Sequence, residues 1–296
     1  MKFMGSKNRI AMEILPIILK ERKEEQYYVE PFCGGLGTMD KVYGKRIASD
    51  KNKYLIAMWK GLQEGKTRPK GISRELYCQA REEYNEGVNR KFSDFMIGWI
   101  GWMGSYNGRF FDGGYSGKSS GRDYIDEQIR NTEKQIEKLR GIIFNVGAYD
   151  EIDYPEGCLI YCDIPYKDTK QYSTSKGFNH EKFWQWVREM TRAGHQVFVS
   201  EYNAPSDFEC VWEKQITNAM NNKNTYKPIE KLFVFHEQNE INSQQIKKDD
   251  NLMGKSSGDT KIESGSKNHL KDFQSDNQSA DKLFANQKQD EVKKDE

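Results

Sequence analysis

Four consecutive residues, Asp163-Ile164-Pro165-Tyr166, have side chains and an order that are well suited to chemistry on a planar base. They follow the apolar run 158–162, which is typical of a buried central strand. The carboxylate would therefore lie at the edge of a sheet, where ligands usually bind. It could accept an amino hydrogen, a neighbouring backbone carbonyl could accept another, and the tyrosine ring could stack on the base. The simpler alternative is an ordinary turn that ends a strand.

A second group of candidate residues follows a strand expected at 27–29. It is the run Glu30-Pro31-Phe32-Cys33-Gly34-Gly35-Leu36-Gly37. The glycine spacing does not match the G-x-G-x-x-G dinucleotide fingerprint, and a Walker lysine is missing. A glycine turn can still let a small adenosine-containing ligand approach the backbone. Asp50, at the end of the next expected strand, could accept hydrogen bonds from ribose hydroxyls or cap the helix that follows.

The segment 105–118 mixes glycines, aromatic rings and basic side chains, so it resembles neither a good core segment nor a plain linker. In a loop of this kind Asn107 and Arg109 can reach base edges, and Lys118 can contact phosphates. Tyr106 offers a ring that can stack on a base. A surface Ω-loop or hairpin without function is the alternative interpretation.

Composition sets limits on the class of protein. The 296 residues include 46 Lys and Arg against 45 Asp and Glu, for a net charge of +1, so any contact with nucleic acid must come from local clustering. We find neither a run of about 20 apolar residues nor the apolar core of a secretion signal. The five cysteines form no C-x-x-C pair and no zinc set with the four histidines. We therefore expect reduced thiols, a cytoplasmic location and no metal.

The elements that must position these residues alternate between strands and helices. Periodicity predicts strands at 27–29, 46–49, 142–146, 158–162, 196–200 and 231–235, and helices at 10–18, 53–64, 74–86, 125–139 and 180–193. A connecting helix is also expected between the glycine loop and the second strand. The pattern predicts an open α/β sheet built from residues 1–65 and 141–240, with a mostly helical insertion at 66–140. Residues 241–296 are polar and are expected to be a disordered tail.

The glycine loop, Asp50 and the motif at 163–166 occur in a definite order, and Phe3-Met4-Gly5-Ser6-Lys7 precedes them. Together they resemble the Dam-type family of adenine-specific DNA methyltransferases, over about residues 1–237. That family has a cofactor loop of the form E-P-F-x-G-x-G and a catalytic D-P-P-Y motif. The resemblance implies a Rossmann-like, S-adenosylmethionine-dependent methyltransferase sheet with a target recognition region at 66–140.

The resemblance also implies a role for each matching residue. Lys7 would lie near the carboxylate of S-adenosylmethionine, and Asp50 would hold its ribose. The implied cofactor-binding set is Phe3, Lys7, Glu30, Pro31, Phe32, Gly34, Gly35, Gly37, Asp50 and Asp163.

The implied catalytic set is the motif itself, Asp163, Ile164, Pro165 and Tyr166. Asp163 would accept a hydrogen bond from the amino group of the target adenine, and Tyr166 would stack on that base. Ile164 stands where the family usually has proline, which makes the turn less rigid. Its backbone carbonyl could still accept the second amino hydrogen.

Tyr106-Asn107-Gly108 matches a short piece of the family's recognition region. The implied DNA-binding set is Tyr106, Asn107, Arg109 and Lys118.

The implied reaction transfers a methyl group from S-adenosylmethionine to the exocyclic amino group of adenine in double-stranded DNA, after the base flips out. We expect a monomer of bacterial or phage type, with a cognate restriction endonuclease as a candidate partner. Two alternatives stay open: an amino methyltransferase that acts on RNA or protein glutamine, and a DNA-binding relative whose catalysis has decayed. A NAD dehydrogenase is disfavoured by the glycine spacing.

Overall fold

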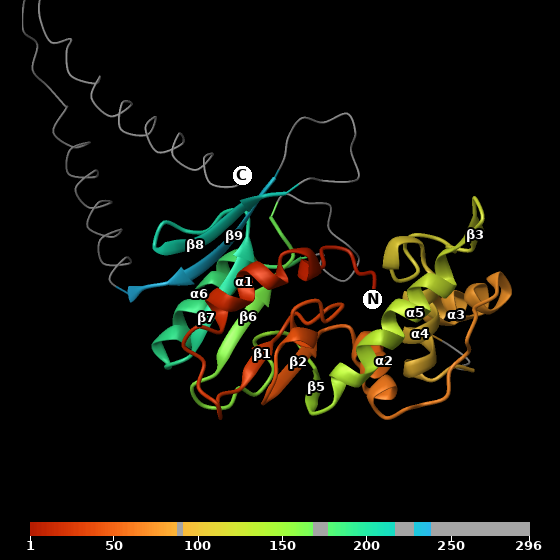
Figure 1. The fold of residues 1–296 in the computed structure, drawn as a ribbon, viewed down its shortest axis with the longest axis horizontal. Helices are drawn as coiled ribbons and strands as arrows, with labels where there is room; N and C mark the ends of the chain where they lie inside the picture. Colours follow the sequence, from red (N-terminus) through yellow and green to blue (C-terminus); the bar gives the residue numbers. More distant parts are fainter. Residues whose placement is uncertain (88–90, 168–176, 217–227, 238–296) are drawn as a thin grey trace, which may run out of the picture. The chain divides into compact units, whose positions relative to one another are not determined.

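The protein is built on a seven-stranded sheet with the strand order β5-β2-β1-β6-β7-β9-β8 (Figure 1). The structure is a computed structural model that describes residues 1–87, 91–167, 177–216 and 228–237. The tail expected at 241–296 lies outside the described residues, as do residues 168–176, which follow the motif at 163–166. Within the described part, every helix is too short or too polar to span a lipid bilayer.

The sheet is mostly parallel. Its strands are β1 (Tyr28–Glu30), β2 (Arg46–Asp50), β5 (Ile142–Val146), β6 (Leu159–Asp163), β7 (Gln196–Glu201), β8 (Phe208–Gln215) and β9 (Ile229–Phe235). The first five of these run parallel, and β9 pairs antiparallel with both β7 and β8. The six strands expected from the sequence are confirmed. Strand β8 was not anticipated, because this edge strand is largely exposed and its charged residues break the alternation of polar and apolar side chains.

The helices are α1 (Ala11–Ile18), α2 (Lys53–Gln63), α3 (Arg74–Glu86), α4 (Asp94–Gly104), α5 (Tyr124–Ile136) and α6 (His180–Arg192). Ser73 and Asn179 cap the N-termini of α3 and α6, since their side chains accept hydrogen bonds from backbone amides of the first turns. The prediction of a connecting helix between the glycine loop and β2 is wrong. That connection holds only the single 3₁₀ turn η2 (Met39–Lys41).

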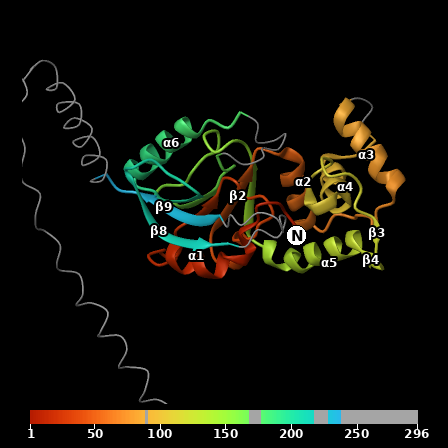
Figure 2. The same ribbon diagram turned by 90° about the horizontal axis from the view of Figure 1, so that it is seen from above.

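Helices cover both faces of the sheet, with α6 on one face and α1 on the other (Figure 2). The central strand β6 shows why both faces are needed. Leu159 and Tyr161 point into the core that includes α1, α2 and α4, whereas Ile160 and Cys162 pack in the core that includes α6. A continuous apolar run is what a parallel strand buried on both faces requires. Burial of each such side chain stabilises the fold by roughly 1.5–3 kcal/mol.

The insertion shares its core with the sheet through close packing of α4 against α2. A Cβ atom at Gly98 would come within 2.2 Å of the Tyr54 carbonyl oxygen, and one at Gly61 would come within 2.2 Å of the Phe95 ring. The two glycines therefore let the helix backbones approach closely. Helices α3, α4 and α5 carry the loop at 105–118, together with the 3₁₀ turn η3 (Tyr106–Gly108) and the short hairpin strands β3 (Lys118–Ser119) and β4 (Arg122–Asp123).

Candidate active site

Acidic residues end four neighbouring parallel strands at one edge of the sheet. Asp50 ends β2, Glu30 ends β1, Asp163 ends β6 and Glu201 ends β7. A fifth acid, Glu230, lies at the start of the antiparallel strand β9. The strand order reverses between β1 and β6, and ligands of open α/β sheets bind at such a switch point. The topology therefore places the glycine loop and the motif at 163–166 on either side of this switch point.

Lys7 is the cation at the centre of this edge. Its Nζ lies 3.0 Å from Oδ1 of Asp163 and 3.6 Å from Oε1 of Glu230. Burial raises the pKa of Asp163 to about 6, although Lys7 acts to lower it. Burial also disfavours the charge on Lys7, but the attraction of Asp163 and Glu230 raises its pKa above the usual range. The ammonium is thus engaged by two protein carboxylates, which the sequence analysis did not anticipate.

Tyr166 is held in a fixed orientation beside this ion pair. Its hydroxyl donates a hydrogen bond of 2.5 Å to Oε2 of Glu230. The ammonium of Lys7 lies 4.4 Å from the centre of its ring, and the ring of Tyr202 meets it edge to face at 4.6 Å. The structure therefore brings Asp163 and Tyr166 together, as the sequence predicts, through Lys7 and through two residues that the sequence does not single out, Glu230 and Tyr202.

Two acids lie next to the glycine loop: Glu30, which is buried, and Asp50, which is partly exposed. Oδ2 of Asp50 accepts from the Gly34 amide at 3.3 Å, and Oδ1 accepts from the Asn52 amide at 2.9 Å. Burial raises the pKa of Asp50 to about 6 and that of Glu30 to about 8. Glu30 accepts a hydrogen bond from the Tyr28 hydroxyl. The cap of α2 is Asn52, so the alternative role of Asp50 as a helix cap is not what the structure shows.

The N-terminal segment packs closely against the glycine loop. A Cβ at Gly35 would come within 2.6 Å of Cβ of Phe3, and one at Gly34 would come within 2.8 Å of the Phe3 ring. A Cβ at Gly37 would similarly meet the hydroxyl of Ser6 at 2.7 Å. This close packing positions the 3₁₀ turn η1 (Lys7–Arg9), and with it the ammonium of Lys7, beside Asp163.

Phe32 and Pro31 occupy the stretch between β1 and the glycines. The ring of Phe32 stacks on Tyr149 at 5.6 Å and meets Phe178 and Phe183 edge to face. It thus packs in an aromatic cluster on the α6 side of the sheet. Pro31 is buried.

Two acids of the site were missed by the sequence analysis. Glu201 accepts hydrogen bonds from the backbone amides of Lys167, at 2.6 Å, and of Tyr202, so it ties β7 to the chain just after Tyr166. Glu230 is 6% exposed. The signal for Glu201 is its place directly after an expected strand, the same pattern that singled out Asp50 and Asp163. Glu230 gives no such signal, because an acid that precedes an expected strand is usually solvated.

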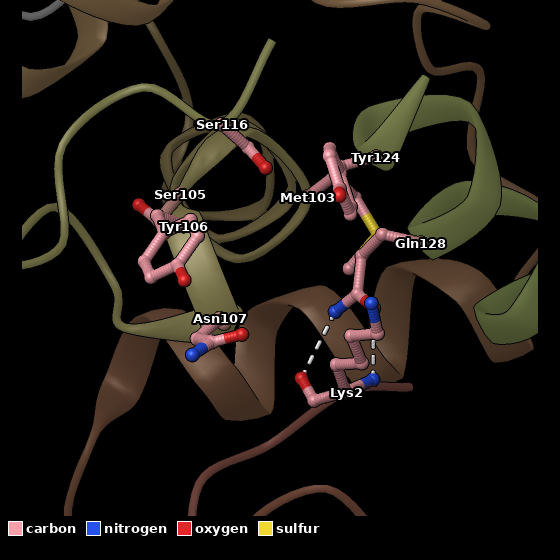
Figure 3. Close-up of a pocket in the computed structure, with 9 residues that line it drawn as sticks. Lys2, Met103, Ser105, Tyr106, Asn107, Ser116, Tyr124 and Gln128 are labelled. Carbon is pink, nitrogen blue, oxygen red and sulfur yellow. Dashed lines mark hydrogen bonds between the residues drawn. The ribbon is translucent and has the colours of Figure 1, made fainter. Parts of the chain in front are cut away.

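The candidate DNA-binding residues divide into two groups. Tyr106 and Asn107 lie on one side of a cavity of about 90 Å³, and Tyr124 and Gln128 lie on the other (Figure 3). The backbone of Lys2 exchanges two hydrogen bonds with the Gln128 side chain at the base of the cavity. The other lining residues are Met103, Ser105, Gly108 and Ser116.

Arg109 and Lys118 do not line this cavity. Arg109 follows η3, and Lys118 lies on the exposed hairpin, 3.5 Å from Asp123. The interpretation of segment 105–118 as poor core is wrong for Phe110 and Phe111. Both are buried, because they pack on the aromatic rings of α3 and α4.

In the described ranges no group of three or more His, Cys, Asp or Glu side chains is arranged to hold a metal ion. All five cysteines carry free thiols, and Cys158 and Cys162 are buried in the core.

A mostly parallel sheet with helices on both faces, and an acidic D-I-P-Y motif at its switch point, define the Rossmann-like methyltransferase class. Within this class the chain belongs to the family of D12 class N6 adenine-specific DNA methyltransferases, whose profile matches residues 3–234. This match confirms the resemblance drawn from the sequence motifs.

Other comparisons add little to the family match. A search of curated protein sequences returned no significant match. Among the solved structures that match, SMU.472 is a candidate methyltransferase in complex with SAH, with 12% sequence identity and a TM-score of 0.33. The alignment covers 78% of this chain but only 52% of that one, so the chain spans about half the length of SMU.472. The family assignment therefore rests on the matched residues 3–234.

Proposed function

We propose that the protein transfers a methyl group from S-adenosylmethionine to the N6 amino group of adenine in double-stranded DNA. The observation that carries the proposal is the place of Asp163. Its carboxylate ends β6 at the switch point, beside β1 and its glycine loop. Asp50 ends the next strand on the far side of β1. The family to which the chain belongs supports the same reaction.

We assign the cofactor to the switch point at the carboxyl ends of β1 and β6, beside the glycine loop and Asp50. The fit rests on Asp50, a partly exposed carboxylate at the end of β2 that can accept hydrogen bonds from ribose hydroxyls. Phe3 fills the space beside Gly34 and Gly35, so its proposed role is to close this side of the cofactor site. S-adenosylmethionine bound there would supply a methyl group on a sulfonium, which is already a good leaving group.

The residues of the motif would activate the target amine. The lone pair on N6 of adenine is delocalised into the ring, so the nitrogen is a poor nucleophile. Asp163 and the backbone carbonyl of Ile164 would accept its two hydrogens and stabilise the positive charge that develops during transfer. Asp163 must be ionised for this purpose, and with a pKa of about 6 it is mostly ionised at neutral pH.

Ile164 replaces the proline that is usual in this motif, yet its side chain is 3% exposed and packs in the core that includes α6. Packing can restrain the turn where a proline ring would otherwise fix φ. The burial of Ile164 therefore favours a working site over the alternative of a decayed one.

The target recognition region is assigned to the insertion at 66–140. Tyr106 and Asn107 support the assignment, because Tyr106 is 52% exposed and both residues line the cavity beside α5. We propose that Tyr106 stacks on a base, that Asn107 and Arg109 contact base edges, and that Lys118 contacts the DNA backbone. A monomer acting on duplex DNA, with or without a partner endonuclease, fits this arrangement.

Transfer of a tritiated methyl group to duplex DNA, RNA or protein tests the function. We expect the wild-type chain to label adenine in duplex DNA. Asp163→Ala should lower turnover by at least about a hundredfold, the scale of loss when one stabilising group is removed, while calorimetry still detects cofactor binding. Asp126→Ala serves as a matched control, because this acid is exposed on α5.

Each other result identifies a different function. Labelling of RNA or protein alone would favour the other amino methyltransferases. Binding of cofactor and DNA without transfer would favour a decayed relative. Near-normal turnover of Asp163→Ala would show that the assigned site is wrong.

A further inference from the structure

Glu230 is a buried acid that no part of the proposed chemistry uses. It lies at the second position of β9, is 6% exposed, and contacts two residues of the site. Its Oε2 accepts the 2.5 Å hydrogen bond from the hydroxyl of Tyr166, and its Oε1 lies 3.6 Å from the ammonium of Lys7. A single carboxylate thus connects the ring assigned to base stacking with the cation next to Asp163.

Packing alone does not account for an acid at this position. A buried carboxylate costs free energy unless it is paired and hydrogen-bonded, and an apolar side chain would fill the same space without that cost. Both oxygens of Glu230 are directed at the site. The position therefore favours a role in the site over one in the core.

The charges of the site explain what a second acid contributes. Methyl transfer develops positive charge on the amine beside Asp163, and the ammonium of Lys7, 3.0 Å from that carboxylate, opposes this charge. A second carboxylate near Lys7 partly cancels the repulsion between its ammonium and the developing charge. It also holds the ammonium over the ring of Tyr166, at 4.4 Å from the ring centre.

We propose that Glu230 is a positioning residue for methyl transfer, which orients the ring of Tyr166 and holds Lys7 against Asp163. The inference rests on the proposed function and extends it to a residue outside the D-I-P-Y motif. Glu230 acts through Tyr166 and Lys7 and does not itself contact the target base.

A double-mutant cycle separates this role from a structural one. Glu230→Gln keeps the size of the side chain but removes its charge, and Tyr166→Phe keeps the ring but removes its hydroxyl. Each variant should lower kcat by about tenfold or more, as expected for loss of a hydrogen bond to a charged group. The KM for cofactor should stay near the wild-type value. The double variant should lose less than the product of the two single losses, because both remove the same contact.

Fluorescence of 2-aminopurine at the target position provides a readout that a structural role would not move. We expect Glu230→Gln and Tyr166→Phe to change the wild-type fluorescence response in the same way, since both release the ring. Glu209→Gln is the matched control, because Glu209 is exposed on the neighbouring strand β8 and pairs with His236. It should leave kcat and fluorescence unchanged.

The outcomes separate the inference from the function on which it rests. An active wild-type chain with normal kcat and fluorescence in Glu230→Gln would overturn the inference alone. Losses that multiply independently in the double variant would do the same. If Glu230→Gln fails to fold, Tyr166→Phe tests the inference instead. Normal kcat and fluorescence in Tyr166→Phe would show that the contact between its hydroxyl and Glu230 plays no part in methyl transfer. A wild-type chain that transfers no methyl group would overturn the proposed function and the inference together.

Discussion

The ammonium of Lys7 lies 3.0 Å from the carboxylate of Asp163, and this pair joins the N-terminal segment to the end of the central strand β6. The contact depends on the glycine loop, because Phe3 packs against Gly34 and Gly35 and thereby places η1 beside β6. Lys7 thus influences the pKa of Asp163, the acid that we assign to the target amine. Its charge lowers the pKa of Asp163, which burial raises to about 6.

Replacement of Lys7 by methionine should shift the pH dependence of methyl transfer. Asp163 must be ionised to accept the amino hydrogens, so wild-type activity should fall as the pH drops through about 6. Without the ammonium the pKa of Asp163 rises, and the acidic limb of kcat/KM should move upward by about one pH unit, equivalent to ~1.4 kcal/mol. The profile is measured at a temperature where circular dichroism shows both proteins folded.

Lys45→Met is the control for the Lys7 experiment, because Lys45 pairs with Glu25 in an exposed position. It should leave the acidic limb where it is. If the acidic limb of kcat/KM lies at the same pH in Lys7→Met as in the wild type, Lys7 does not influence the acid whose ionisation controls turnover.

Glu30 should make the protein less stable as the pH rises. Burial raises its pKa from 4.5 to about 8 in the folded state. Between these values the folded state binds more protons than the unfolded state, so the free energy of unfolding falls with increasing pH. The slope from this group is at most about 1.4 kcal/mol per pH unit.

Glu30→Gln tests this linkage, because glutamine keeps an oxygen that can accept from the Tyr28 hydroxyl but does not titrate. The difference in unfolding free energy between variant and wild type should grow in favour of the variant from pH 6.5 to 8, as measured by urea denaturation. The contributions of other titrating groups, such as Asp50, to the pH dependence are the same in both proteins and cancel in this difference. Glu25→Gln, on an 80% exposed side chain, should show no such trend. A constant difference across this range would contradict a raised pKa for Glu30.

The sequence predicts the sheet well because its central strands are buried on both faces. The run at 158–162 is continuous and apolar for that reason, and Asp163 marks where it meets solvent. Strand β8 shows the limit of such patterns, since an exposed edge strand need not alternate polar and apolar residues. The sequence predicts a helix in the connection from β1 to β2, but its glycines pack against Phe3 and the connection holds one 3₁₀ turn.

Apart from the motif resemblance, the sequence points to a site acid where that acid directly follows an expected strand. This pattern predicts Asp50 and Asp163, and Glu201 fits it as well. The partners of Lys7 could not be found, because its contact with Glu230 depends on the antiparallel pairing of β9 with β7, which brings distant parts of the chain together. Motif matching assigned Lys7 to the cofactor carboxylate. In the structure its ammonium contacts Asp163 and Glu230, while its role toward the cofactor stays a prediction.

Gly35→Ala should disturb the packing of the N-terminal segment against the glycine loop. The added Cβ would come within 2.6 Å of Cβ of Phe3, so one of the two segments must move. Overpacking of this kind costs typically about 1–3 kcal/mol of unfolding free energy. We also expect weaker cofactor binding in calorimetry. Gly71→Ala is the matched control, because a Cβ there meets no atom within 4 Å. Equal stability and cofactor affinity of the two variants would argue against close packing between Phe3 and the glycine loop.

Tyr106→Ala should weaken DNA binding without affecting the fold. The side chain of Tyr106 is 52% exposed at the cavity beside α5, so its loss removes little buried surface. Stacking of one base on an aromatic ring is worth about 1–3 kcal/mol, which corresponds to a loss of affinity of roughly fivefold to a hundredfold. Fluorescence anisotropy with a labelled duplex measures the change, and calorimetry should show unaltered cofactor binding. Tyr43→Ala is the control, because Tyr43 is 87% exposed and precedes β2 at its opposite end from Asp50. If both variants bind duplex DNA as tightly as the wild type, Tyr106 does not stack on a base and the recognition surface must be sought elsewhere on the insertion.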